Sequence, residues 1–149
     1  MLTTPFNLLL SDDDADDCIF FREALAELHV HATLTTVSDG VQLMELLLNR
    51  EQPLPHVLYL DLNMPRKNGF DCLIEIRRHK KLQQLPVIIF STSFDIRVVD
   101  RLYDCGATHY IRKPAKFSCL KEVISKSLDI ISNLPNGPVP KEKFVLGAD

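Results

Sequence analysis

The sequence HVLYLDLNMP, residues 56–65, decides the fold. Its first half, His56–Leu60, is a short apolar run that predicts a β-strand. The run ends abruptly at the carboxylate of Asp61, and Pro65 marks a loop that begins just beyond it. A segment with helical periodicity follows over residues 70–81. The stretch is therefore typical of one strand–loop–helix unit with an acid at the carboxyl end of its strand.

The same unit occurs five times along the chain, without internal sequence repeats. The predicted strands are Phe6–Leu10, Ala32–Val37, His56–Leu60, Val87–Phe90 and Thr108–Arg112. The predicted helices are Asp14–His29, Val41–Leu48, residues 70–81, a segment through Ile96, Val99 and Leu102 that ends at Gly106, and Phe117–Ser132. This alternation predicts an α/β fold, a doubly wound (βα)5 flavodoxin-like three-layer sandwich. We adopt the strand order 2-1-3-4-5, which is common for this architecture, without deriving it.

Length and composition indicate one globular domain. We expect residues 1–132 to form it and residues 133–149 to be a C-terminal tail with no output domain, a disordered end being favoured over a dimer arm. The net charge of −3 gives no reason to expect a nucleic-acid partner. We find no signal peptide and no apolar stretch that could span a membrane, and the four cysteines are widely spaced. A cytoplasmic protein is the expectation.

Polar side chains follow four of the five predicted strands at their carboxyl ends. The first strand is followed by Ser11, Asp12, Asp13 and Asp14, the third by Asp61, the fourth by Ser91, Thr92 and Ser93, and the fifth by Lys113. In parallel sheets of this kind ligands bind at the carboxyl ends of the strands, near the point where the strand order reverses. We therefore expect one site that combines several carboxylates, a hydroxyl and an ammonium group.

Closely spaced carboxylates favour a bound cation, because they cannot all stay ionised together without one. Oxygen ligands indicate Mg²⁺, and the absence of His or Cys at these strand ends argues against zinc or copper. Carboxylates can also act as nucleophiles that form an aspartyl phosphate. Each group alone has an ordinary structural explanation, such as a helix N-terminus for the acids or a loop position for Lys113. Their joint occurrence at strand ends favours a phosphoryl site.

These segments resemble the receiver domain of two-component response regulators, of the stand-alone kind. The resemblance covers about Phe6 to Ile131. It rests on LLSDD at residues 9–13, LDLNMP at residues 60–65 with Gly69, FST at residues 90–92 and YIRKP at residues 110–114. It implies a single-domain response regulator, a phospho-acceptor switch in a phosphorelay. The only chemistry implied is its own Mg²⁺-dependent phosphorylation and dephosphorylation, so it is not an enzyme in the usual sense.

The resemblance also implies a role for each site residue. Asp61 becomes the 4-aspartylphosphate, with a sensor histidine kinase or a histidine phosphotransfer protein as donor. Mg²⁺ is ligated directly by Asp13, Asp61 and the backbone carbonyl of Asn63, and Asp12 contributes to the metal site through water. Ser91 and Lys113 bind the phosphoryl oxygens, Ser91 and Tyr110 form the conformational switch, and the Lys113–Pro114 peptide is cis. A downstream protein reads the switch, and a homodimer is a further option.

Some alternatives stay open at this point. The acidic pair could be Asp13 and Asp14 instead of Asp12 and Asp13, although the earlier pair directly follows the apolar strand. Thr92 could compete with Ser91 as the hydroxyl. Two other classes share part of the pattern, a haloacid dehalogenase-type phosphatase and a nucleotide-binding α/β module. The first class uses Asp-x-Asp on its first strand, whereas here the third strand gives Asp61-Leu62-Asn63. The second class uses a glycine-rich loop after its first strand, where this chain has aspartates.

Overall fold

A computed structural model of the chain describes residues 5–49, 51–133 and 137–147. Along the chain the elements are β1 (Phe6–Ser11), α1 (Ala15–Glu27), β2 (Ala32–Val37), α2 (Gly40–Leu48), β3 (Val57–Leu60), α3 (Gly69–Arg78), β4 (Val87–Ser91), α4 (Ile96–Asp104), β5 (His109–Arg112), α5 (Phe117–Ser132), the 3-10 helix η1 (Lys141–Lys143) and β6 (Val145–Leu146). The five expected units are all present, and their boundaries differ from the prediction by three residues at most.

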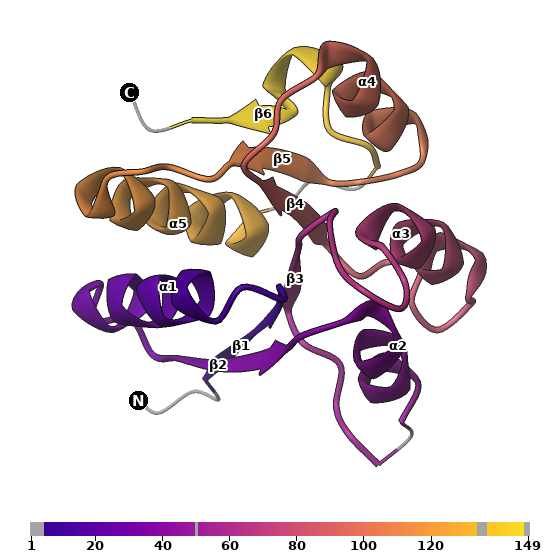
Figure 1. Cartoon of the computed structure of the whole chain (residues 1–149), viewed down its shortest axis with the longest axis horizontal. Helices are drawn as coiled ribbons and strands as arrows, with labels where there is room; N and C mark the ends of the chain where they lie inside the picture. Colours follow the sequence, from indigo (N-terminus) through magenta and orange to yellow (C-terminus); the bar gives the residue numbers. More distant parts are fainter. Residues whose placement is uncertain (1–4, 50, 134–136, 148–149) are drawn as a thin grey trace.

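The strands form one all-parallel sheet with the order β2-β1-β3-β4-β5-β6. Helices α1 and α5 cover one face, and α2, α3 and α4 cover the other (Figure 1). β3 and β4 are buried along their whole length, because helices lie on both faces of the sheet. The predicted order 2-1-3-4-5 is therefore confirmed, with one strand added at the β5 edge.

Short polar side chains begin the helices that follow β1, β2, β3 and β4. Asp14, Asp39, Asn68 and Asp95 are the N-cap residues of α1, α2, α3 and α4, and each accepts a hydrogen bond from a backbone N–H of the first helical turn. Such caps satisfy N–H groups that have no partner inside the helix. The acids at the strand ends thus serve two purposes, since some cap helices and others remain free for chemistry.

The C-terminal segment, defined as residues 137–147, departs from the expectation of a disordered tail. β6 pairs in parallel with Tyr110 and Ile111 of β5, and Phe144, just before it, is only 1% exposed. The prediction of a disordered tail was wrong because it rested on the prolines and the glycine of this segment alone. The edge of β5 offers unpaired backbone groups, and Phe144 and Leu146 can bury apolar surface there.

Among the described residues no helix is both long enough and apolar enough to cross a lipid bilayer.

Candidate functional site

Asp61 lies at the carboxyl end of β3, in the centre of the sheet. Its backbone N–H donates to the carbonyl of Ser11 at 2.9 Å, which brings the ends of β1 and β3 together. The residue is only 6% exposed. Burial raises the pKa of the Asp61 carboxyl to about 6; Lys113 and the backbone N–H groups of Asn63 and Leu62 oppose this shift, and Asp12 adds to it.

Carboxylate oxygens of Asp12, Asp13 and Asp61 all lie within 4.8 Å of one another. Asp12 is 1% exposed, whereas Asp13 is exposed. Asp14 instead caps α1 by accepting a hydrogen bond from Asp17 N–H at 3.1 Å. Of the two pairs that the acidic run allowed, the structure thus groups Asp12 and Asp13 with Asp61 and uses Asp14 for the helix.

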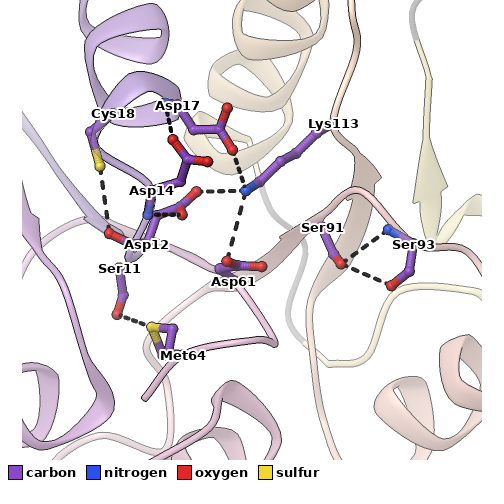
Figure 2. Close-up of polar contacts among 10 residues, drawn as sticks. All are labelled: Ser11, Asp12, Asp14, Asp17, Cys18, Asp61, Met64, Ser91, Ser93 and Lys113. Carbon is purple, nitrogen blue, oxygen red and sulfur yellow. Dashed lines mark hydrogen bonds and ion pairs between the residues drawn. The ribbon is translucent and has the colours of Figure 1, made fainter.

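Lys113 reaches into this acidic cluster from the end of β5 (Figure 2). Its Nζ lies 2.7 Å from Asp12 Oδ2, 2.8 Å from Asp17 Oδ2 and 3.8 Å from Asp61 Oδ2. Its side chain is 10% exposed. Burial alone would lower the pKa of the ammonium, but the surrounding carboxylates of Asp12, Asp17 and Asp61 raise it above its usual range. Lys113 is therefore a permanent cation in the cluster.

Ser91 is completely buried at the end of β4, and Thr92 next to it is exposed. The Ser91 hydroxyl pairs with the hydroxyl of Ser93 at 3.1 Å and accepts from Ser93 N–H at 3.3 Å. Figure 2 shows this pair turned away from the acidic cluster. The structure thus places Ser91 at the expected strand end, but joins its hydroxyl to Ser93 and not to Asp61.

Tyr110 lies in β5 with 1% of its surface exposed. Its hydroxyl donates to the carbonyl of Ser93, and Phe94 packs edge-on against its ring at 5.7 Å between centroids. The two residues expected to form the switch, Ser91 and Tyr110, are therefore linked through Ser93. Ser91 contacts the Ser93 hydroxyl, and Tyr110 contacts the Ser93 backbone carbonyl.

The loop after β3 is shaped by close packing. Asn63 is exposed, and its backbone N–H donates to Asp61. Gly69, the first residue of α3, donates its N–H to the carbonyl of Leu62 at 3.0 Å. A Cβ at position 69 would lie 2.1 Å from the carbonyl oxygen of Asp61, so only glycine allows α3 to start this close to the site.

Two contacts of the site were missed by the sequence reasoning. Asp17, in the first turn of α1, accepts a hydrogen bond from Lys113 that joins residues 96 positions apart. The Ser11 hydroxyl donates to the sulfur of Met64 at 3.0 Å, beneath the cluster. Acids in the first turn of a helix carry no local signal that one of them contacts a lysine at the end of a distant strand.

The expectation of a cis peptide bond between Lys113 and Pro114 is wrong. The peptide bonds described for residues 5–49, 51–133 and 137–147 are all trans, that of Lys113–Pro114 included. The trans form is the lower in free energy for X–Pro bonds unless the surroundings compensate. Lys113 N–H still donates to the carbonyl of Ser91 at 2.8 Å, so the lysine is directed to the site with a trans bond.

The residues present fit a hard divalent cation. The three clustered carboxylates offer oxygen ligands only, and Asp12 Oδ2 is buried without a hydrogen bond, its one close partner being the Lys113 ion pair. Mg²⁺ and similar ions prefer such oxygen donors. One lysine cannot balance three neighbouring carboxylates and Asp17, which leaves negative charge for a cation to neutralise.

Comparisons with known proteins agree with this geometry. The family model of the response regulator receiver domain matches residues 8–125. A chemotaxis protein CheY homolog of Campylobacter jejuni is 30% identical over 121 residues, which cover 81% of this chain and 91% of that protein. Response regulator Rcp1 of Synechocystis sp. is 27% identical over 124 residues, covering 80% and 84%.

Solved structures give the same result for the fold. The phosphorylated cyanobacterial phytochrome response regulator RcpA superimposes with a TM-score of 0.80 at 29% identity, covering 91% of this chain and 99% of that one. The Mn²⁺-bound form of Rcp1 gives a TM-score of 0.73 at 28% identity, with the same coverage. The latter structure shows a divalent ion in a protein that this chain is similar to.

Proposed function

The chain belongs to the response regulator receiver domain family, and on this premise we propose that it is a stand-alone phospho-acceptor switch with Asp61 as the acceptor. The carrying observation is the cluster in which the buried Asp61 carboxylate lies with Asp12, Asp13 and the Lys113 ammonium. Support for the stand-alone form comes from the CheY homolog, of which this chain matches 91%.

In the proposed reaction a carboxylate oxygen of Asp61 attacks the phosphorus of a phosphohistidine. A P–O bond to Asp61 forms while the P–N bond breaks, and the imidazole nitrogen of the donor leaves with the bonding electron pair. The Lys113 ammonium stabilises the negative charge on the phosphoryl oxygens from its place beside Asp61. Attack of water on the phosphorus then breaks the bond to Asp61, releases inorganic phosphate and returns the free carboxylate.

Asp12, Asp13, Asp61 and the backbone carbonyl of Asn63 are the residues that would hold Mg²⁺. When bound, the ion supplies charge neutralisation for the carboxylates and for the phosphoryl oxygens. The chain's own contribution is to fix the acids, since Asp61 is tied to β1 through Ser11 and Asp12 accepts from Asp14 N–H at 3.0 Å.

The switch in this proposal is the chain of contacts from Ser91 through Ser93 to Tyr110. A phosphoryl group on Asp61 offers a new acceptor for the Ser91 hydroxyl, which then leaves Ser93. Because the carbonyl of Ser93 accepts from the Tyr110 hydroxyl, movement at Ser93 changes the support of that ring. The surface of α4 and β5 would carry this change to a downstream protein.

The proposed partners follow from the same chemistry. A sensor histidine kinase or a histidine phosphotransfer protein donates the phosphoryl group, and a protein target or a second copy of the chain reads the result. The acidic net charge of −3 agrees with protein partners and not with nucleic acid.

Incubation with acetyl phosphate and Mg²⁺, followed by intact-protein mass spectrometry, tests the acceptor. The wild-type chain should gain the mass of one phosphoryl group, and Asp61→Asn should gain none. Asp16→Asn, which removes an exposed acid from α1, should be labelled like wild type. Chelation of Mg²⁺ by EDTA should abolish labelling. Equal labelling of wild type and Asp61→Asn would refute the assignment.

A further inference from the structure

Asp17 is an acid of the first turn of α1 that lies outside the carboxylate cluster yet contacts Lys113. Its Oδ2 accepts a hydrogen bond from Lys113 Nζ at 2.8 Å, and its side chain is 35% exposed. The neighbouring Asp16 is exposed, and among the described residues it forms no ion pair. Two adjacent acids of one helical turn thus differ in burial and in contact with the site lysine.

The ammonium of Lys113 is held by two carboxylates that are not the acceptor. Asp12 at 2.7 Å and Asp17 at 2.8 Å are both closer than Asp61 at 3.8 Å, which is beyond hydrogen-bond distance. An ammonium group has three N–H donors, and hydrogen bonds between charged groups are about twice as strong as neutral ones. In this arrangement at least one donor points to Asp17 (Figure 2).

Asp12 and Asp17 differ in what happens when the site is loaded. Asp12 belongs to the carboxylate cluster that fits a cation, and a cation bound there would neutralise its negative charge. Asp17 is not part of that cluster, so its carboxylate continues to attract Lys113. A phosphoryl group on Asp61 must therefore share the ammonium with Asp17.

We propose that Asp17 is a positioning residue that competes with the phosphoryl group for the Lys113 ammonium and thereby weakens the hold on the phosphorylated state. The inference rests on the proposed function of Asp61. Partial exposure limits the strength of the Asp17 contact, so its removal should tighten phosphoryl binding by about threefold to tenfold. The side chain would thus tune the duration of the signal without touching the reacting atoms.

Beryllofluoride, a non-covalent mimic of the aspartyl phosphoryl group, provides the test. Its dissociation constant in the presence of Mg²⁺ can be measured by ¹⁹F NMR, a method that does not depend on tryptophan, which the chain lacks. Asp17→Asn and Asp17→Ala should bind more tightly than wild type by the stated factor. Asp16→Asn removes the same charge from the same turn and should stay within about twofold of wild type, since exposed charges interact weakly.

Two further measurements separate contact from structure. Asp17→Glu keeps a carboxylate within reach of Lys113 and should restore wild-type affinity. Chemical denaturation in EDTA confirms that each variant is folded. Unchanged or weaker beryllofluoride binding by both Asp17→Asn and Asp17→Ala would overturn the proposal, as would equal tightening by Asp16→Asn. Failure of wild-type protein to bind beryllofluoride at all would instead refute the function proposed for Asp61.

Discussion

The carboxyl edge of β1, β3 and β5 and the C-terminal segment, residues 137–147, are two regions built on different principles. At the carboxyl edge, polar residues sit directly after apolar strands, and the parallel sheet brings them together. The C-terminal segment contributes no carboxylate to this cluster and depends on contacts with α4, β5 and α5. In the first region the strand order gathers charged residues into a site. In the second, apolar residues are buried against neighbouring elements.

Contacts of the C-terminal segment reach three elements. Phe144 packs edge-on against Tyr103 of α4 at 5.1 Å, and its carbonyl accepts from Tyr110 N–H of β5 at 3.0 Å. Lys126 of α5 donates to the carbonyl of Gly147 at 2.8 Å. The segment therefore contacts Tyr110, one of the residues proposed for the switch. The acidic cluster thus lies at the ends of the first and third strands, whereas the neighbouring edge of β5 is covered by the C-terminal segment.

Replacement of Phe144 by alanine is expected to have the largest effect on stability. The side chain is 1% exposed, and removal of a buried phenylalanine costs about 3–5 kcal/mol of the free energy of unfolding. Urea denaturation measures the change. Val145→Ala, next to it and 42% exposed, is the matched control and should change stability by about 0.5 kcal/mol or less. Equal stability of Phe144→Ala and wild type would mean that the segment is a tail after all.

Replacement of Gly69 by alanine tests the packing of the carboxyl edge. The added Cβ would lie 2.1 Å from the carbonyl oxygen of Asp61 and 2.9 Å from Leu62 Cα, so the backbone beside the acceptor must move. Such overpacking costs about 1–3 kcal/mol, and Mg²⁺ affinity should fall with it. Calorimetric titration with Mg²⁺ and urea denaturation measure both. Gly147→Ala meets no atom within 4 Å and should leave both unchanged.

The stability of the metal-free protein should depend on pH through Asp61. The pKa of this carboxyl is raised to about 6 in the folded state, mainly by burial, from 3.8. The folded state therefore binds more protons than the unfolded state between about pH 4 and 6, and stability falls as the pH rises through this range. Above it, Asp61→Asn should be more stable than wild type by on the order of 2 kcal/mol.

Urea denaturation in EDTA from pH 4 to 8 measures this dependence. The Asp61→Asn variant should lose the downward slope, and Asp16→Asn should keep it. Saturating Mg²⁺ should reduce the difference between wild type and Asp61→Asn at neutral pH, because an ion that binds the folded state stabilises it. A stability that rises from pH 4 to 6 by the same amount in wild type and in both variants would contradict the role of burial at Asp61.

The smallest effect is expected for the ion pair between Lys141 and Asp100, which joins the C-terminal segment to α4. Its atoms are 3.3 Å apart, and the side chains are 55% and 43% exposed. Exposed pairs contribute little, so Lys141→Gln should change the free energy of unfolding by about 0.5 kcal/mol or less. A loss as large as that of Phe144→Ala would show that charge and not apolar burial holds the segment.

The site was largely predictable because its residues are unusual for their positions. Asp12, Asp13, Asp61 and Lys113 are charged groups at the ends of apolar runs, and the cluster they form agrees with that prediction. Asp17 was not recognised, because an acid in the first turn of a helix already has a sufficient local explanation. Only the packing of α1 against the sheet directs it to Lys113.

The C-terminal segment shows the opposite case. The prolines and the glycine at residues 135–140 predicted a tail, and the apolar residues near Phe144 and Leu146 are too few for a periodic pattern. Their burial depends on the unpaired edge of β5 and on space beside Tyr103 of α4, which lie more than 30 residues earlier. Such long-range complementarity has no counterpart in local sequence.

The sequence by itself determined the five strand–helix units, the family and the identity of the acidic cluster, because apolar periodicity and charged strand ends are local features. The tertiary structure alone decided two further points. It assigned Asp17 to Lys113 and the C-terminal segment to the edge of β5. The physical reason is the same in each, since the free energy of these contacts depends on atoms that only folding brings within reach.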